Sequence, residues 1–85
     1  MTASCELYWK PGVHKELRSI DRAMVARIVN SAEALRSEPL PHGARKLEGA
    51  EHTWRIRVGD YRVVYEVLPP AVTILHVRHR KDVYR

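Results

Sequence analysis

Arginine residues crowd two short segments on either side of a glycine–aspartate pair. Arg55 and Arg57 alternate with apolar residues before Gly59-Asp60, and Arg62 follows the pair closely. A guanidinium group presents a planar fork of N–H donors that matches the oxygens of a phosphate, and it stays charged at neutral pH. These arginines therefore predict a binding site for an anionic partner, with nucleic acid as the first class to consider.

A second group of polar side chains closes the chain. Histidine exchanges protons near neutral pH, arginine stabilises charge that develops on a phosphate, and tyrosine stacks on a base or donates a hydrogen bond. RNA carries its own nucleophile, the 2′-hydroxyl, so its cleavage without a metal needs only positioning, electrostatics and a proton acceptor. The candidates for catalysis are His79, Arg80 and Tyr84, and the candidates for RNA binding include Arg78 and Lys81.

Other kinds of active site lack their signatures in this sequence. There is no GxxxxGK[ST] or GxGxxG motif to cradle a nucleotide, and there is no CxxC pair. His76 and His79 have no neighbouring carboxylate pattern that would complete a metal site. We interpret Cys5 as a small buried residue rather than a nucleophile. We therefore expect neither a metal nor another cofactor.

The composition is that of one small globular domain, spanning residues 1–85. Fifteen Lys and Arg residues outnumber ten Asp and Glu residues, and nine of the basic residues fall within residues 45–85. A single cysteine excludes an internal disulfide, and no apolar run reaches the ~18–20 residues of a membrane span. These features predict a cytoplasmic protein with no membrane partner.

The first half of the chain changes from strand periodicity to helix periodicity. Residues 5–9 alternate and include two aromatic side chains, which predicts a first strand. Apolar residues at helical spacing then predict a two-helix hairpin, in which Asp21 caps the second helix and Pro39 and Pro41 end it. The apolar stripes comprise Val13, Leu17 and Ile20 in the first helix, and Met24, Val25, Ile28, Val29, Ala32 and Leu35 in the second.

After a polar connector, residues 42–49, the second half of the chain switches to a period of two. The element order β-α-α-β-β-β predicts an α+β fold in which a twisted, mainly antiparallel sheet carries the helices on one face. The last three strands form an antiparallel meander, with turns at Gly59-Asp60 and Pro69-Pro70. We expect these strands at residues 53–58, 61–67 and 72–77.

A two-residue loop at Gly59-Asp60 sets Arg57 directly opposite Arg62, and directly opposed residues share a face of a sheet. Like charges in this position are destabilising, which favours a polyanion in the gap. The alternative is that Glu66 or Asp82 neutralises the cluster. The register predicts an apolar face of Trp54, Ile56, Val58, Tyr61, Val63 and Tyr65, and an opposite face of Arg55, Arg57, Arg62, Val64 and Glu66.

The register of the last strand stays open at this point. A tight loop at Pro69-Pro70 places Leu75 and Val77 on the arginine face, and Ile74 and His76 on the core face. A longer loop reverses this arrangement, because a slip of one residue moves every side chain to the other face.

Two stretches of the chain resemble the RelE/ParE superfamily of toxins from type II toxin–antitoxin modules. Residues 46–49 and 54–67, which read KLEG and WRIRVGDYRVVYEV, are similar to the family's KL-x-G … W/Y-x-I-R/K … G-x-YR-x-x-Y core. Residues 77–84, VRHRKDVY, resemble its V-G-H-R-x-x-V-Y tail. The resemblance covers nearly the whole chain and implies a RelE-like fold.

The resemblance also implies an activity and partners. A RelE-type toxin enters the ribosomal A site and cuts mRNA there, by attack of the 2′-hydroxyl on the adjacent phosphate. A cognate RelB-like antitoxin neutralises such a toxin, and the complex binds operator DNA through the antitoxin. The sequence leaves open whether an antitoxin would dock on the helix pair or on the sheet edge.

The resemblance assigns roles residue by residue. Arg55 and Arg57 match basic residues of the catalytic strand, and Arg62 matches the arginine at the scissile phosphate. The tail arginine is Arg80 by spacing from Val77, or Arg78 by spacing back from the final tyrosine. The implied catalytic set is Arg57, Arg62, His79, Arg80 and Tyr84, and the implied RNA-binding set is Lys46, Arg55, Arg57, Arg78 and Lys81.

The chain departs from the family pattern in two places. Arg78 stands where the family usually has glycine. Arginine at positions 55 and 57 cannot act as a general base, because it does not deprotonate in proteins. Where lysine would take the proton in other members, His79 is the expected base here.

Two other functions remain open from the sequence. A ParE-like toxin poisons DNA gyrase through protein contacts and shares the fold and most of the motifs. An inactive family member would bind RNA without cutting it. Arg62 together with the tail favours the nuclease over the gyrase poison.

Overall fold

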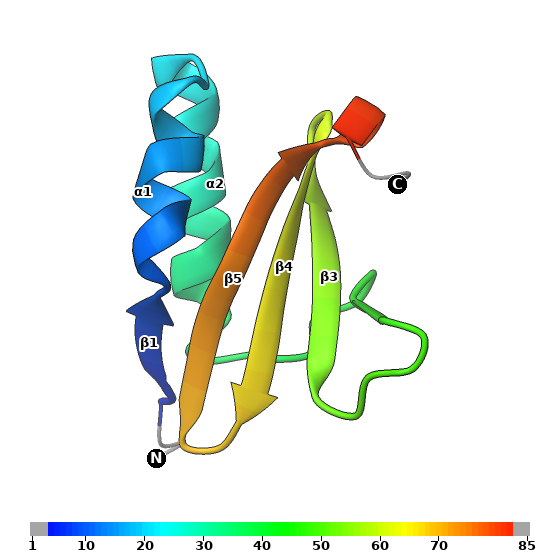
Figure 1. The fold of residues 1–85 in the computed structure, drawn as a ribbon. Coiled ribbons are helices and arrows are strands. Elements are labelled where there is room, and N and C mark those ends of the chain that lie inside the picture. The colour runs from blue at the N-terminus through cyan, green and yellow to red at the C-terminus, as the bar shows by residue number, and fades with distance from the viewer. Residues whose placement is uncertain (1–3, 83–85) are drawn as a thin grey trace.

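The expected element order is confirmed, with one additional strand. The computed structural model describes residues 4–82, and two helices lie on one side of a five-stranded sheet (Figure 1). None of the helices in this described part is long and apolar enough to cross a bilayer. The elements are β1 (Glu6–Trp9), α1 (Pro11–Arg18), α2 (Arg22–Ala34), β2 (Arg45–Lys46), β3 (Thr53–Val58), β4 (Tyr61–Leu68), β5 (Ala71–His79) and the 3₁₀ helix η1 (Arg80–Asp82).

The strands lie in the order β1-β5-β4-β3-β2. The meander of β3, β4 and β5 is antiparallel as expected, whereas β1 runs parallel to β5. The segment expected as a polar connector contains β2, which pairs with β3 and forms the outer edge of the sheet. A two-residue strand has too little alternation to be recognised from its own sequence.

The helices begin where local chemistry allows them to begin. Pro11 occupies the first turn of α1, where its missing N–H costs no hydrogen bond. The carboxylate of Asp21 accepts a hydrogen bond from the N–H of Met24 at 3.3 Å, so the predicted N-cap of α2 is confirmed. Val13, Ile28 and Ala32 are the buried residues of the two helices and face the sheet.

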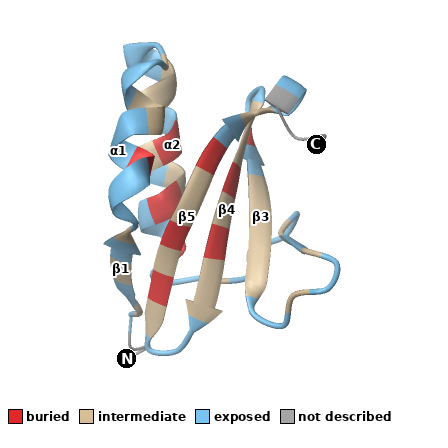
Figure 2. Ribbon diagram, in the orientation of Figure 1, coloured by how far each residue is buried: buried red, intermediate tan, exposed pale blue. Residues whose placement is uncertain are grey.

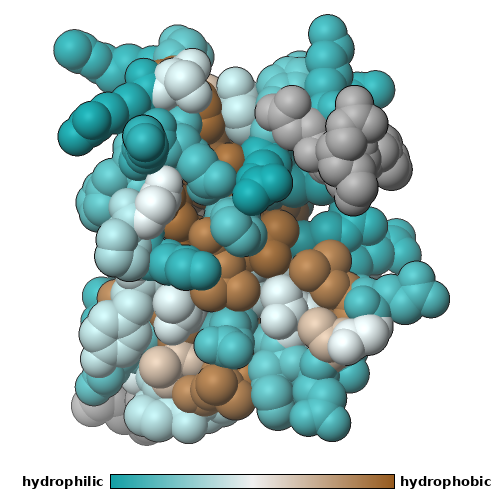
Figure 3. Space-filling view, in the orientation of Figure 1, coloured by the Kyte–Doolittle hydropathy of each residue, from teal (hydrophilic) through white to brown (hydrophobic). Residues whose placement is uncertain are grey.

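The core lies between the helix pair and one face of the sheet, where the buried segments of α2, β4 and β5 face one another (Figure 2). Tyr65 is fully buried, and its hydroxyl donates a hydrogen bond to the carbonyl oxygen of Pro39 at 2.8 Å. Burial raises the pKa of Tyr65 to about 12. Hydrophilic side chains cover much of the surface, and apolar side chains reach it in a central strip (Figure 3). The sheet residues of the core are Val58, Val63, Tyr65, Val72, Ile74 and Val77.

The predicted register of the β3–β4 hairpin is confirmed at every pair from Trp54↔Tyr65 to Val58↔Tyr61. The loop depends on Gly59, whose φ of +61° lies in the left-handed region that favours glycine. A Cβ at this position would also lie 2.8 Å from Cε of Met24 on α2. A side chain at this position would therefore meet both the backbone preference of the loop and the end of the Met24 side chain.

A β-bulge in β5 decides the face that its C-terminal half presents. The tight loop at Pro69-Pro70 is confirmed, since Leu68 pairs with Ala71 and Tyr65 pairs with Ile74. The register then shifts by one residue, so that Val64 pairs with His76. The expectation that a tight loop places His76 on the core face is therefore wrong. Val77 likewise lies on the core face, where it is 3% exposed, and not on the arginine face.

Candidate nucleic-acid interface

The sheet face turned away from the helices carries its side chains in rows that run across the strands, and three of these rows lie nearest the β3–β4 loop. The first row is entirely arginine, the second mixes basic and apolar residues, and the third is polar. We define the basic face as the charged and histidine residues of the first two rows. The first row is Arg57, Arg62 and Arg78, the second is Arg45, Arg55, Val64 and His76, and the third is Thr53, Glu66, Thr73 and Tyr8.

Arginine lies directly opposite arginine at three positions of the basic face. Arg62 of β4 lies between Arg57 of β3 and Arg78 of β5, and Arg45 of β2 lies opposite Arg55. Each such pair costs free energy of folding, roughly 0.2–1 kcal/mol by analogy with other cross-strand pairs. Among residues 4–81, no carboxylate forms an ion pair with Arg45, Arg55, Arg57 or Arg62. Neutralisation by Glu66 is therefore not seen.

Four of these arginines surround a hollow. It has a volume of about 390 Å³ and is lined by Arg45, Arg55, Arg57, Arg62 and Gly43. Nε of Arg62 is buried and has no hydrogen-bond partner within the described residues. A buried N–H donor without a partner is costly. The described residues contain no group of three or more side chains that could hold a metal ion.

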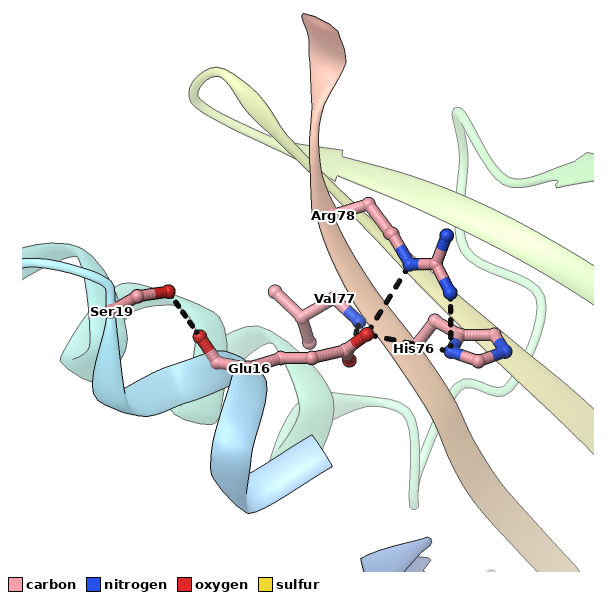
Figure 4. A network of polar contacts seen from close by, with 5 residues as sticks. All are labelled: Glu16, Ser19, His76, Val77 and Arg78. Carbon is pink, nitrogen blue, oxygen red and sulfur yellow. Dashed lines mark hydrogen bonds and ion pairs between the residues drawn. The ribbon is translucent and has the colours of Figure 1, made fainter. Parts of the chain in front are cut away.

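Within the described residues, Arg78 is the one member of the first row with a carboxylate partner, which is Glu16 (Figure 4 shows this contact). Strand β1 pairs with β5 only as far as Ile74, so no described strand lies along the edge of β5 beyond that point. Glu16 of α1 reaches this open edge, where its Oε1 accepts a hydrogen bond from the N–H of Val77 at 2.8 Å. Its Oε2 accepts a hydrogen bond from Nε of Arg78 at 3.2 Å.

His76 completes the same network. Its Nδ1 lies 3.5 Å from Oε2 of Glu16 and 3.2 Å from an Nη of Arg78 (Figure 4). No described residue hydrogen-bonds to its other ring nitrogen, Nε2. Glu16 therefore holds two side chains at the β5 border of the basic face.

The histidine predicted from the sequence as a catalytic residue, His79, lies on the opposite side of the sheet. It pairs with Tyr61, and the two rings meet edge to face with centroids 5.1 Å apart. Because Tyr61 shares the helix-facing side with Val58 and Val63, the register separates His79 from the basic face. Its Nδ1 accepts a hydrogen bond from the N–H of Lys81 at 3.1 Å.

The remaining tail candidates lie at the end of the sheet. The backbone N–H of Arg80 donates a hydrogen bond to the carbonyl of Asp60 at 2.8 Å, and its guanidinium lies 3.9 Å from the Asp60 carboxylate. The structure therefore ties Arg80 to the β3–β4 loop, at the end nearest the first row. Lys81 is exposed in η1. Tyr84 lies outside the described residues.

Two adjacent basic residues of β2 point to opposite sides of the sheet. Arg45 pairs with Arg55 and lies on the basic face, whereas Lys46 pairs with Trp54, on the side of the helices. The RNA-binding set inferred from the sequence contained Lys46 and omitted Arg45. Sequence reasoning also missed Glu16 and left His76 without a face. No local signal reveals these placements, because each depends on a contact between segments distant in the sequence.

Known proteins resemble this chain over nearly its whole length. The family model described as the ParE toxin of the type II toxin–antitoxin system parDE matches residues 7–84. A chain in the archaeal RelE–RelB complex from Pyrococcus horikoshii OT3 is 30% identical, with a TM-score of 0.81 over 94% of this chain and 99% of that one.

Two further solved structures have the same fold. A chain of the RelBE2 toxin–antitoxin complex from Mycobacterium tuberculosis is 27% identical, with a TM-score of 0.79 over 96% of this chain and 97% of that one. A mutant of the E. coli toxin RelE in the free state is 19% identical, with a TM-score of 0.79 over 94% of this chain and 87% of that one. At 19% identity, the likeness to the E. coli RelE mutant concerns the fold alone.

Proposed function

We propose, from the premise that the chain belongs to the ParE toxin family of type II toxin–antitoxin systems, that it is a ribosome-dependent endoribonuclease. It cleaves mRNA in the ribosomal A site and thereby inhibits translation. The observation that carries this proposal is the basic face, with a buried Arg62 donor that has no partner within the described residues. The likeness to chains of RelE–RelB complexes at 27–30% identity supports the same activity.

The reaction is an internal transfer of the phosphoryl group. The 2′-oxygen forms a bond to phosphorus while the bond from phosphorus to the 5′-oxygen breaks, and negative charge builds up on the phosphoryl oxygens. Arg57 and Arg62 lie opposite each other beside the hollow and would stabilise that charge. Arg55 and Arg78 would hold the flanking backbone, Arg80 would approach from the end of the sheet, and Tyr84 would orient a base.

The proton of the 2′-hydroxyl needs an acceptor, and the arginines of the basic face cannot serve. The motif comparison within the sequence favoured His79. The structure places that residue beside Tyr61 on the helix-facing side. A base on the same face as the arginines would need no rearrangement of the sheet.

The partners of this toxin follow from the same premise. The structures from P. horikoshii and M. tuberculosis are complexes of a toxin with its antitoxin. We propose a cognate RelB-like antitoxin for this chain, and a complex that binds operator DNA through the antitoxin. The toxin itself engages the ribosome and mRNA through the basic face.

The test is expression of the chain with and without the neighbouring gene, followed by mapping of mRNA 5′ ends. We expect growth arrest that the neighbour relieves, and cuts confined to translated reading frames. Arg62→Ala is expected to abolish both effects. Arg18→Ala is the matched control, because it removes the same charge from an exposed position on α1, away from the basic face. Full cleavage by Arg62→Ala would contradict the proposed site, and RNA binding without cleavage would indicate an inactive member.

A second function is favoured by the description of the matching family, which is that of ParE toxins. A ParE-like toxin would poison DNA gyrase without touching RNA. Induction would then produce DNA breaks and an SOS response while mRNA stayed intact. The same induction experiment, with DNA integrity measured beside the mRNA ends, separates the two functions.

A further inference from the structure

The proposed cleavage requires a proton acceptor near the arginines. Few of the described residues on the basic face, or in the third row beside it, can accept a proton near neutral pH. Histidine is the side chain whose ordinary pKa suits this task between roughly pH 5 and 8. His76 is the histidine of the basic face, and it lies in the row next to Arg62, on the neighbouring strand. Glu66 is two rows away from Arg62 on its own strand. His76 is therefore the best-placed acceptor.

The bulge in β5 creates this placement. Without the register shift, His76 would face the helices and Val77 would face solvent. With the shift, Val77 is buried in the core and His76 stands on the arginine side with 42% of its side chain exposed. Bulges commonly re-aim a side chain beside an active site. The same bulge puts Arg78 opposite Arg62, so one irregularity positions two polar groups.

Glu16 orients the imidazole. Its carboxylate is anchored on the N–H of Val77, and from there it approaches Nδ1 of His76 at 3.5 Å. A proton on Nδ1 would point to this carboxylate and leave Nε2 free to accept. Arg78 competes, because its guanidinium lies 3.2 Å from the same Nδ1 and can only donate. A substrate phosphate that draws Arg78 away would leave Nδ1 to Glu16.

We propose that His76 is the general base of this toxin and that Glu16 is its positioning residue. This inference rests on the proposed endoribonuclease function. Nε2 takes the proton of the 2′-hydroxyl, and the oxygen electron pair forms the bond to phosphorus. The bond to the 5′-oxygen breaks, and that oxygen takes a proton from water. The products are a 2′,3′-cyclic phosphate and a 5′-hydroxyl, and the imidazolium then returns its proton to solvent.

Charged groups from three elements face His76. Glu16 of α1 lies 3.5 Å from its Nδ1, Arg78 of β5 lies 3.2 Å from the same atom, and Arg62 and Glu66 of β4 lie diagonally across. A base must be neutral to accept a proton. Cleavage should therefore rise with pH through the range in which histidine deprotonates, and then level off.

The experiment is single-turnover cleavage of ribosome-bound mRNA across roughly pH 5 to 8. His76→Gln is expected to lower the plateau rate by about 10²-fold or more and to remove the rising limb of the profile. His52→Gln, at an exposed loop position, is the matched control and should match the wild type. A wild-type rate or an unchanged limb in His76→Gln would overturn the proposal, as would loss of the limb in His79→Gln instead.

Glu16→Gln tests the positioning role. The amide oxygen can still accept from the N–H of Val77, but the negative charge beside His76 is gone. The limb should move to lower pH, and the plateau should fall less than in His76→Gln. A purely structural role would leave the limb in place and would overturn the assignment of Glu16.

The outcomes separate this inference from the function on which it rests. If the wild type cuts mRNA and Arg62→Ala does not, while His76→Gln stays fully active, only the assignment of His76 fails. If the wild type cuts no mRNA, both the endoribonuclease function and the assignment of His76 as its general base are contradicted.

Discussion

Arg57 and Arg62 lie directly opposite each other across β3 and β4, and neither has a carboxylate partner within residues 4–81. The row continues to Arg78 on β5, which does have one, in Glu16. The fold therefore keeps like charges together in the middle of the sheet and neutralises them only at the border. Such an arrangement favours an external polyanion over internal stability.

Removing the charge of Arg57, at the β3 end of the row, should stabilise the protein while it harms the function. We expect Arg57→Ala to keep the wild-type free energy of unfolding or to raise it by about 0.2–1 kcal/mol, because a like-charge pair disappears. Arg57→Lys keeps the charge and serves as the control. Denaturant unfolding at low and high salt measures the effect, since salt screens the repulsion and should narrow the difference. A clear loss of stability in Arg57→Ala at low salt would contradict this account.

Arg45 and Lys46 are adjacent in the sequence but lie on opposite sides of the sheet. Arg45 lines the hollow, so Arg45→Ala should weaken binding of a non-cleavable single-stranded RNA and lower the slope of log affinity against log salt by about 0.7. Lys46→Ala should change the slope less, because its register partner is Trp54. Titrations at several salt concentrations measure both slopes. A larger effect from Lys46 would favour the assignment made from the sequence.

Glu16 joins α1 to the open edge of β5, and its loss should destabilise the fold. Glu16→Ala leaves the N–H of the buried Val77 without its acceptor, which costs about 1–3 kcal/mol. Glu16→Gln retains an acceptor oxygen and is expected to cost less. Hydrogen exchange at the Val77 amide reports the contact directly. Equal stability in the alanine variant and the wild type would show that water replaces the carboxylate at no cost.

Tyr65 should make stability fall at high pH. Burial raises its pKa from 10.0 to about 12, so the unfolded chain loses this proton before the folded protein does. The contribution of Tyr65 is therefore fully present below about pH 10 and disappears as the pH rises to about 12.

Tyr65→Phe should flatten this dependence. It should also lower stability near neutral pH by about 1 kcal/mol, because the hydrogen bond to Pro39 is lost. Urea midpoints between pH 7 and about pH 12 test both effects. The idea fails if the phenylalanine variant loses stability as steeply as the wild type in this window.

The parts of this protein that depend on short-range geometry follow from the order of its amino acids. A two-residue loop at Gly59-Asp60 leaves one register for the hairpin, so the pairing of Arg57 with Arg62 could be predicted without a structure. Helical spacing and the cap at Asp21 likewise predicted α2. In each case the decisive residues are neighbours along the chain.

The residues that complete the basic face are brought there by contacts between segments that are distant in the sequence. The bulge that turns His76 outward arises within β5, where no turn residue marks it, and it lets Val77 fill the core. Arg45 joins the face because β2 pairs with β3, and Glu16 reaches His76 across 60 positions of sequence. These contacts form because the core must be closely packed and because the backbone N–H groups on the open edge of β5 need hydrogen-bond acceptors. Both requirements depend on the whole fold.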